Sequence, residues 1–351
     1  MAIIKLPKNS VDFFKKNQDK IFDSGKLAEG PWNEKLSKKI QDITKAKNAI
    51  GVNSNGSGLV ALLLIYKEYY GRKDIIIQSN TMYGVKTMTK TAGYNLKAYI
   101  DCQIETLMPS FEDVKKTISE YNKDTNRLVL LLSDIGGIIN PDIEKISKFC
   151  KEKNIILIED SAHSFGSTLN KKFSGTFGNA GVYSYYSTKA IFAGEGGVVV
   201  TDDNNIASLM KDFIAYDRFK KKMEIGCNIR LSELQALMIC SVINEYKEII
   251  NNKSKIAKKY IQTCEKFGIK YIPQENNLMN GNYYKFTVIS PNKKISEFLP
   301  KLKTTTSKVY EYSLGNSIKI PEQHLCLPIW FDLEDLISDT AVSEIHDSLK
   351  V

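Results

Sequence analysis

Strand-like apolar segments alternate with helical segments between residues 49 and 203, and this alternation limits the fold more than any other feature of the sequence. Residues 127–133 (RLVLLLS) are almost continuously apolar, which is typical of a strand that is covered on both faces. Residues 142–153 then place apolar side chains three or four positions apart, the spacing of an amphipathic helix. The pattern predicts an α/β fold: right-handed crossovers and an open, mostly parallel sheet with helices on both faces.

Small and polar residues follow the predicted strands at their carboxyl ends. In chain order they are Asn55 and Gly56, Asn80 and Thr81, Asp160, and Ser184. Ligands of open α/β sheets bind in the crevice beyond these strand ends. The sequence therefore predicts that these residues converge on one ligand site.

Residues 155–203 carry the most distinctive chemistry near that site. One buried strand ends in Asp160, a Gly-rich connection leads to a second strand, and Lys189 comes just after the second strand. A glycine cluster at 194–197 then leads into a third apolar strand. An acid and a lysine at neighbouring strand ends suit a cofactor that needs both, and pyridoxal 5′-phosphate (PLP) is such a cofactor.

A second ligand-binding feature precedes a nearly all-apolar helix. The residues 53–58 (NSNGSG) connect a short strand to the segment 59–70 (LVALLLIYKEYY). The open N-terminus of such a helix is a natural phosphate site, because its free N–H groups and its dipole face the ligand. The alternative interpretation is a plain N-cap on a core helix. The spacing matches neither the P-loop nor the dinucleotide-binding fingerprint.

The C-terminal third reads as a smaller α+β domain. We expect residues 1–240 to form the large domain, with the N-terminal helices, and residues 241–351 to form the small one. Local signals set several helix ends: Ser110 and Asp113 have the spacing of a capping box, Ser232 caps a long helix, and Gly268 follows a helix end. The predicted elements after residue 232 are helices at 233–251, 253–266, 295–302, 306–311 and 333–350, and strands at 269–272 and 283–290.

Composition excludes several other classes of protein. The net charge is +9, from 49 basic and 40 acidic residues, but the lysines are dispersed and no basic arm or RNA-binding signature is present, so we expect no nucleic-acid partner. No apolar run approaches the ~20 residues of a membrane helix. The N-terminus lacks a secretory pattern, so a cytoplasmic location is expected. Six scattered cysteines and three dispersed histidines predict neither disulfides nor a metal site.

Three segments resemble one enzyme family. They are IEDSAHSFGS, YSYYSTKAIFAGEGGVVVTDD and GCNIRLSELQA, which are similar to the signatures of the DegT/DnrJ/EryC1/StrS aminotransferases. That family comprises PLP-dependent sugar aminotransferases with the fold of aspartate aminotransferase (fold type I). The likeness runs from about Ser24 to the C-terminus, and the two central motifs together are highly specific.

The resemblance implies catalytic roles for two residues and a cofactor contact for a third. Lys189 would bind PLP covalently and later move a proton between the substrate and the cofactor, a task that suits lysine once its pKa is depressed. Asp160 would pair with the pyridine nitrogen and keep it protonated. His163 takes the place of a glutamine or histidine that contacts the ring oxygen, with structural packing as the alternative.

The resemblance also implies how the rest of the cofactor is held. Gly56, Ser57 and Ser184 match phosphate-binding positions. Asn228 matches an asparagine that reaches the phosphate of the other subunit, which implies a homodimer with shared active sites. Relatives place an aromatic residue over the cofactor ring where this chain has Met82, with Tyr83 next. A thioether can pack on a ring face, and a one-residue shift would bring Tyr83 there instead, so both remain candidates.

The implied activity is transamination of a nucleotide-linked keto-sugar, foremost a 4-keto-6-deoxy hexose, with L-glutamate as amino donor. The amino sugar would enter glycan biosynthesis. Alternatives are an aminotransferase for another carbonyl, such as a keto-acid sugar or a small keto-phosphate, and a regulatory paralogue without turnover. Some relatives are dehydratases with histidine in place of the cofactor-binding lysine, and Lys189 argues against that activity. The sequence does not specify the sugar, the nucleotide or the carbon that is aminated.

Overall fold

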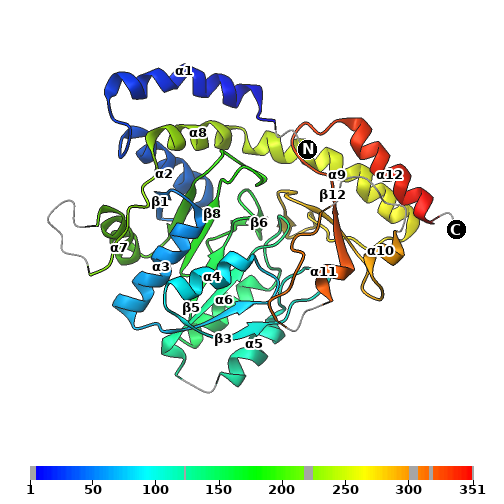
Figure 1. Ribbon diagram of the computed structural model, residues 1–351, viewed down its shortest axis with the longest axis horizontal. Coiled ribbons are helices and arrows are strands. Elements are labelled where there is room, and N and C mark those ends of the chain that lie inside the picture. The colour runs from blue at the N-terminus through cyan, green and yellow to red at the C-terminus, as the bar shows by residue number, and fades with distance from the viewer. Residues whose placement is uncertain (1–4, 122–123, 217–223, 300–306, 316–318, 350–351) are drawn as a thin grey trace.

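A seven-stranded sheet organises the larger part of the molecule (Figure 1). The computed structural model describes residues 5–121, 124–216, 224–299, 307–315 and 319–349. The strand order is β1 (Asn48–Val52), β9 (Gly197–Thr201), β8 (Ala180–Ser184), β5 (Ile156–Asp160), β4 (Leu128–Ser133), β2 (Asp74–Gln78) and β3 (Asn95–Ile100). Only the pairings of β9, with β1 and with β8, are antiparallel. The predicted mostly parallel sheet of the fold type I class is therefore confirmed.

Helices cover both faces of this sheet, as the apolar strand sequences require. On one face α3 (Asn55–Tyr70), α4 (Tyr83–Thr91) and α7 (Asn204–Ala215) pack on alternate strand residues such as Ile75 and Ile77. On the other face α5 (Phe111–Glu120) and α6 (Ile143–Glu152) pack on Ile76 and its neighbours. Every residue of β2, β4, β5, β8 and β9 is buried, which explains why their sequences show no polar alternation.

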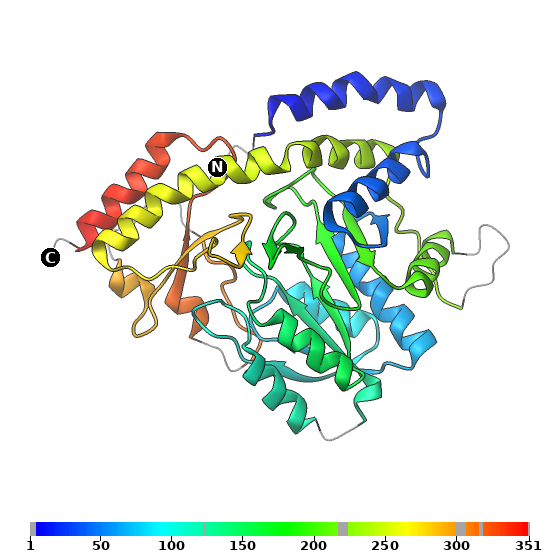
Figure 2. The same cartoon turned by 180° about the vertical axis from the view of Figure 1, so that it is seen from behind.

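Two long helices join the sheet to the C-terminal part of the chain. Helix α8 (Glu233–Asn244) packs against α1 (Lys8–Ser24) and α2 (Pro31–Thr44), and α9 (Tyr246–Phe267) continues away from them (Figure 2). The break lies at Glu245, whereas the sequence predicted it near residue 252. That prediction is wrong because no glycine or proline marks the true break. The domain boundary near residue 240 stays a prediction; that position lies inside α8.

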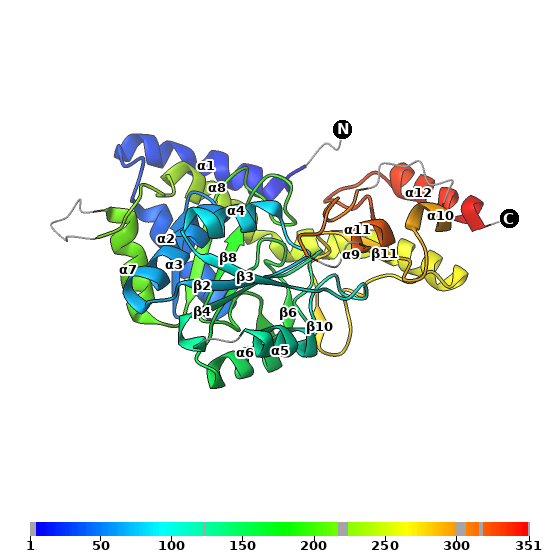
Figure 3. The same cartoon turned by 60° about the horizontal axis from the view of Figure 1, so that its bottom comes forward.

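The C-terminal part has an apolar core of its own and lies beside the sheet (Figure 3). Strands β11 (Phe286–Ile289) and β12 (His324–Leu327) pair antiparallel, and α12 (Asp335–Leu349) packs along α9. Short helices α10 (Ile295–Phe298) and α11 (Ile320–Gln323) complete this part. None of the helices in the described ranges combines the length and the apolar character that a membrane crossing requires.

Two C-terminal predictions are corrected. The helix expected at 306–311 is absent from residues 307–311, where Ser307 forms a β-bridge with Cys326; residue 306 lies outside the described residues. The strand expected at 269–272 is reduced to one bridge, between Tyr271 and Val288. The sequence also missed a small sheet in which β10 (Met279–Asn280) returns to the hairpin of β6 (Thr168–Leu169) and β7 (Lys172–Phe173). The structure of these regions depends on strand pairing between segments that are distant in the sequence.

Candidate active site

Asp160 lies at the centre of the site, buried at the last residue of β5. Its Oδ1 accepts hydrogen bonds from Asn55 Nδ2 at 3.0 Å and from the Ala162 N–H at 3.3 Å. Its Oδ2 accepts from the Ser133 hydroxyl at 3.2 Å, and that hydroxyl is also 2.7 Å from Thr81 Oγ1. Residues that end β4 and β5 or closely follow β1 and β2 thus meet here, at the strand ends where the sequence placed the site. Burial raises the pKa of Asp160, and the nearby Lys189 charge opposes that rise.

Lys189 lies in the turn that follows β8, half-buried, with its N–H bonded to the Tyr186 carbonyl at 2.9 Å. Burial lowers the pKa of its amine to about 8; the charge of Asp160 opposes this shift and that of Lys285 adds to it. Near neutral pH, a larger fraction of this amine is uncharged than for an ordinary lysine. An uncharged amine is the nucleophilic form, so the structure gives Lys189 the character of a reactive lysine.

His163 is buried between two tyrosines from the C-terminal part. Its ring centroid is 4.5 Å from that of Tyr284 and 6.0 Å from that of Tyr310. Burial, with the charges of Lys189 and Lys285, holds the pKa of His163 well below its usual value, so the ring is neutral. Its Nδ1 is buried and has no hydrogen-bond partner among the described residues. A buried nitrogen of this kind is rare in native proteins and marks a place for a ligand atom.

The N-terminus of α3 is fixed beside Asp160. Ser54 caps the helix by accepting the Ser57 N–H at 3.1 Å, and Asn55 also donates to the Val182 carbonyl at 2.9 Å. A Cβ on Gly56 would lie 3.2 Å from Met88 Sδ, which is a tight fit. Ser184, at the end of β8, is buried, and its Oγ is 3.4 Å from the Tyr186 N–H. The structure brings Gly56, Ser57 and Ser184 to the same sheet edge; their contact with a phosphate stays a prediction.

Met82 and Tyr83 lie at the start of α4, with exposed fractions of 43% and 52%. The Tyr83 ring packs edge-on against Tyr312 with centroids 6.0 Å apart, and its N–H donates to the Tyr312 hydroxyl. The Met82 side chain lies against Gly84. Both side chains are partly exposed, so which of them covers the cofactor ring stays a prediction.

Asn228 is exposed in the loop that follows α7. The neighbouring Ile229 carbonyl accepts the Asn53 N–H at 2.9 Å, which places this loop beside the residues that lead into α3. The structure contains one subunit, so the contact of Asn228 with a partner subunit stays a prediction.

Several residues of the site were missed by sequence reasoning. Tyr284, Tyr310, Lys253 and Lys285 reach it from the C-terminal part, and burial together with the Asp160 charge raises the pKa of Tyr310 far above its usual value. No sequence motif identifies these residues, because only the packing of distant segments brings them to the strand ends. The hydrogen bonds of Asn55 and Ser133 to Asp160 could have been anticipated from one sequence signal, the positions of these residues at strand ends.

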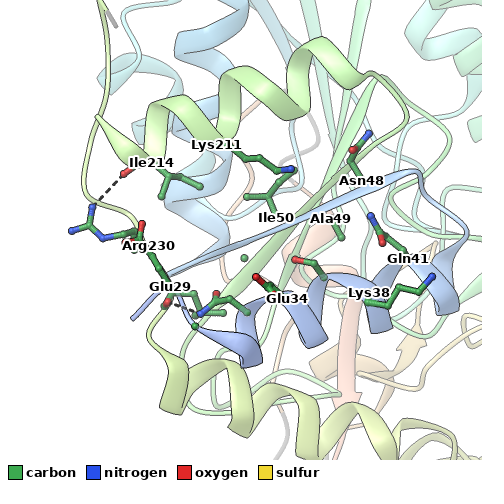
Figure 4. A pocket seen from close by; sticks show the side chains of 15 residues that line it. Glu29, Glu34, Lys38, Gln41, Asn48, Ala49, Ile50, Lys211, Ile214 and Arg230 are labelled. Atoms are coloured by element: carbon green, nitrogen blue, oxygen red, sulfur yellow. Dashed lines mark hydrogen bonds between the residues drawn. The ribbon is translucent and has the colours of Figure 1, made fainter. Parts of the chain in front are cut away.

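Two cavities differ in their relation to this site. One of about 240 Å³ is lined by residues 187–190 and by the C-terminal part, and so adjoins Lys189. The other, of about 480 Å³, lies between α2, β1 and α7 (Figure 4). Glu34, Lys38 and Arg230 line the larger cavity, and none of the predicted catalytic or cofactor-binding residues does. Of these two cavities, the smaller one is therefore the one that adjoins the predicted catalytic residues.

Comparison with known proteins agrees with this geometry. The sequence model of the DegT/DnrJ/EryC1/StrS aminotransferase family matches residues 9–346. The Helicobacter pylori UDP-4-amino-4,6-dideoxy-N-acetyl-beta-L-altrosamine transaminase is 27% identical over 250 residues, which are 68% of this chain and 64% of that protein. The matched segment thus spans less than two thirds of that relative.

Two further proteins extend over more of the chain. A pleiotropic regulatory protein from Geobacillus stearothermophilus is 23% identical, covering 94% of this chain and 92% of its own. The crystal structure of a DegT DnrJ EryC1 StrS aminotransferase from Brucella abortus superposes with a TM-score of 0.84 at 17% identity, over 97% of this chain and 96% of that one. The structural match establishes the shared fold.

Proposed function

This chain belongs to the DegT/DnrJ/EryC1/StrS aminotransferase family, and on that premise we propose that it is a PLP-dependent aminotransferase. Its reaction would move the amino group of L-glutamate to a nucleotide-linked keto-sugar, foremost a 4-keto-6-deoxy hexose, for glycan biosynthesis. One observation carries the proposal: at the carboxyl ends of the sheet strands, Lys189, with a pKa lowered to about 8, is near enough to the buried carboxylate of Asp160 for each charge to shift the pKa of the other group.

The residues present fit PLP. The hydrogen bonds to the Asp160 carboxylate come from Asn55, Ser133 and Ala162, all neutral donors. No lysine, arginine or histidine nitrogen lies within 4.0 Å of Asp160 among the described residues. A protonated pyridine nitrogen would supply the cation that this buried carboxylate needs. The unpartnered Nδ1 of His163 likewise fits the polar ring oxygen of the cofactor.

The division of labour follows from the environments of these groups. PLP, when bound, withdraws electrons from the substrate carbon next to the transferred nitrogen. Lys189 would move the proton between that carbon and the cofactor, because an amine with a pKa of about 8 exchanges protons readily near neutral pH. Asp160 would hold the positive ring nitrogen in place. The N-terminus of α3, with Gly56 and Ser57, would bind the phosphate.

The sugar substrate and the dimer belong to the proposal as well. The Helicobacter pylori relative is named as a transaminase of a UDP-linked sugar, which supports a nucleotide sugar here. Asn228 is exposed in the loop that follows α7, so its side chain is free to contact a second subunit, and in the proposed homodimer it would reach the phosphate of the partner's site. A keto-acid sugar or a small keto-phosphate is the alternative acceptor.

A regulatory role without turnover is the second candidate. The regulatory relative from Geobacillus stearothermophilus matches nearly the whole chain, and this observation favours the candidate. The retained Lys189 and the buried Asp160 weigh against it, because a scaffold needs neither a reactive lysine nor a buried carboxylate near that lysine.

Cofactor absorbance during a half-reaction tests the proposal. The protein loaded with PLP should be yellow and should bleach when L-glutamate is added, as the cofactor gains the amino group. Lys189→Ala should remain unbleached, whereas Lys151→Ala, an exposed lysine on α6, should behave as the wild type. A wild-type protein that holds PLP and ignores every amino donor would refute the aminotransferase and favour the regulatory role.

A further inference from the structure

The cavity beside Lys189 carries an unusual concentration of positive charge. Lys189 lines it from the large part, and Lys253 of α9 and Lys285 line it from the C-terminal part. Its other lining residues include Thr188, Ser307 and Trp330, and no aspartate or glutamate is among them. The amines of Lys253 and Lys285 stay free when Lys189 holds the cofactor, and two amines around about 240 Å³ without a carboxylate make a cavity that attracts an anion.

Lys253 shows that this charge is uncompensated. The residue is only 3% exposed, and within the described parts of the chain its amine forms neither a hydrogen bond nor an ion pair. Burial and, to a lesser extent, the charge of Lys285 lower the pKa of Lys253 to about 7. A buried amine without a partner is costly, and proteins keep such groups mainly where a ligand pairs with them.

Lys285 connects this cavity to the reacting groups. Its Nζ donates to the Ser307 hydroxyl at 3.1 Å and lies 5.3 Å from the centroid of the Tyr284 ring. Lys189 Nζ lies at the same distance, 5.3 Å, from that ring. Tyr284 also packs on His163, the residue expected to contact the cofactor ring. The cavity therefore adjoins the expected place of the cofactor at Tyr284 and Lys189.

The size of the cavity selects a small ligand. Sites for drug-sized molecules occupy about 300–1,000 Å³, and a nucleotide sugar is larger than many drugs. A cavity of about 240 Å³ suits a short carboxylate instead. The amino donor proposed above, L-glutamate, is such a molecule.

We propose that this cavity is the carboxylate-binding subsite for the amino donor, with Lys253 and Lys285 as the residues that bind the carboxylate. The subsite rests on the proposed function for the identity of its ligand. Its position beside Lys189 brings the α-carbon of the donor within reach of the lysine that would take its proton. The keto carbon of the sugar has to reach the same cofactor atom as the donor amine, but its nucleotide is too large for this cavity and would lie outside it. Changes at Lys253 should therefore affect the two substrates differently.

Glutarate, which has two carboxylates and no amine, tests the subsite without turnover. Isothermal titration calorimetry on the PLP-loaded protein should show glutarate binding that weakens about tenfold or more in Lys253→Met and in Lys285→Met. Lys253→Arg should keep most of the affinity. Lys258→Met, an exposed lysine on the same helix, should bind as the wild type. Thermal unfolding checks that each variant is folded, and a methionine at the buried position 253 should not reduce stability.

Steady-state kinetics then separates this proposal from the proposed function. The KM for L-glutamate should rise at least about tenfold in Lys253→Met, while the KM for the sugar stays unchanged. Glutarate binding that depends on Lys253, in a protein that transaminates nothing, would support the subsite and refute the aminotransferase. Equal glutarate affinity in wild type and in both methionine variants would overturn the subsite, whatever the activity.

Discussion

Asn55 Nδ2 donates a hydrogen bond to Asp160 Oδ1 at 3.0 Å, and this bond ties the first residue of α3 to the last residue of β5. The two residues are 105 positions apart in the sequence. The bond fixes the expected phosphate-binding end and the expected ring-nitrogen partner relative to one another. It therefore sets the distance that a rigid cofactor has to span.

Loss of that bond should weaken both the fold and the binding of PLP. In Asn55→Ala a buried carboxylate loses a donor, which costs about 1.5–3 kcal/mol of stability. Chemical denaturation measures the free energy of unfolding, and fluorescence titration measures PLP affinity. Asn251→Ala, an exposed position on α9, is the control. Unchanged PLP affinity in Asn55→Ala would show that the bond does not organise the site.

Removal of the Asp160 charge should slow the half-reaction with glutamate. Asp160→Asn keeps the shape of the side chain but cannot hold a protonated ring nitrogen, so we expect a loss of about 10²-fold or more in the rate of bleaching. Stopped-flow absorbance measures this rate. Asp332→Asn, at an exposed carboxylate of the C-terminal part, should leave it unaltered. A loss below about threefold in Asp160→Asn would contradict the assigned role.

The lowered pKa of Lys189 should appear in the uptake of PLP by the cofactor-free protein. The uncharged amine attacks the aldehyde, and its fraction grows as the pH rises through the pKa of about 8. Uptake should therefore accelerate from pH 6 to pH 9 with a midpoint near 8 and then level off. Rapid-mixing absorbance gives the profile, with N-acetyl-lysine as the unperturbed reference. A midpoint that coincides with the reference would disprove the shift.

Complementation between two inactive variants tests the shared active site. In a homodimer where Asn228 serves the partner's site, a mixed dimer of Lys189→Ala and Asn228→Ala subunits has one site with both substitutions and one fully intact site. Mixing the two proteins under conditions that exchange subunits should restore activity to each mixed dimer. If Asn228 serves its own subunit, both sites of the mixed dimer are damaged and no recovery occurs.

Glu233 should matter to stability although it lies away from the chemistry. Its buried carboxylate accepts the N–H groups of Trp32 at 2.7 Å and Asn33 at 3.0 Å, at the start of α2. Glu233→Ala should lower the free energy of unfolding by about 2–3 kcal/mol, since two backbone donors lose a charged acceptor. Glu68→Ala, exposed on α3, is the control for denaturant unfolding. Equal stability of the two variants would contradict this account.

Sequence patterns predicted the features that depend on neighbouring residues. The apolar run at 127–133 became β4, and the capping box at Ser110 is present, with the Asp113 N–H bonded to Ser110 Oγ at 3.2 Å. The convergence of Asn55, Thr81 and Asp160 followed from the rule that parallel strands end at one edge. These outcomes need only strand direction and local hydrogen bonding.

The features that the sequence missed depend on packing between distant segments. The break at Glu245 has no glycine or proline to mark it. Ser307 forms a β-bridge with Cys326 where the sequence analysis predicted a helix. Lys253 and Lys285 belong to different elements, and only the fold brings both to the cavity beside Lys189. Nothing local distinguishes them from the many exposed lysines of the chain.

The most direct test of the central claim follows the nitrogen atom itself. The purified protein with PLP is incubated with ¹⁵N-labelled L-glutamate and candidate nucleotide-linked 4-keto-6-deoxy hexoses, and the products are measured by mass spectrometry. The account predicts an amino sugar that carries ¹⁵N, with an equal amount of 2-oxoglutarate, and none of either product from Lys189→Ala. Labelled amino sugar formed equally well by Lys189→Ala, or no labelled product from any keto-sugar, keto-acid sugar or keto-phosphate, would contradict it.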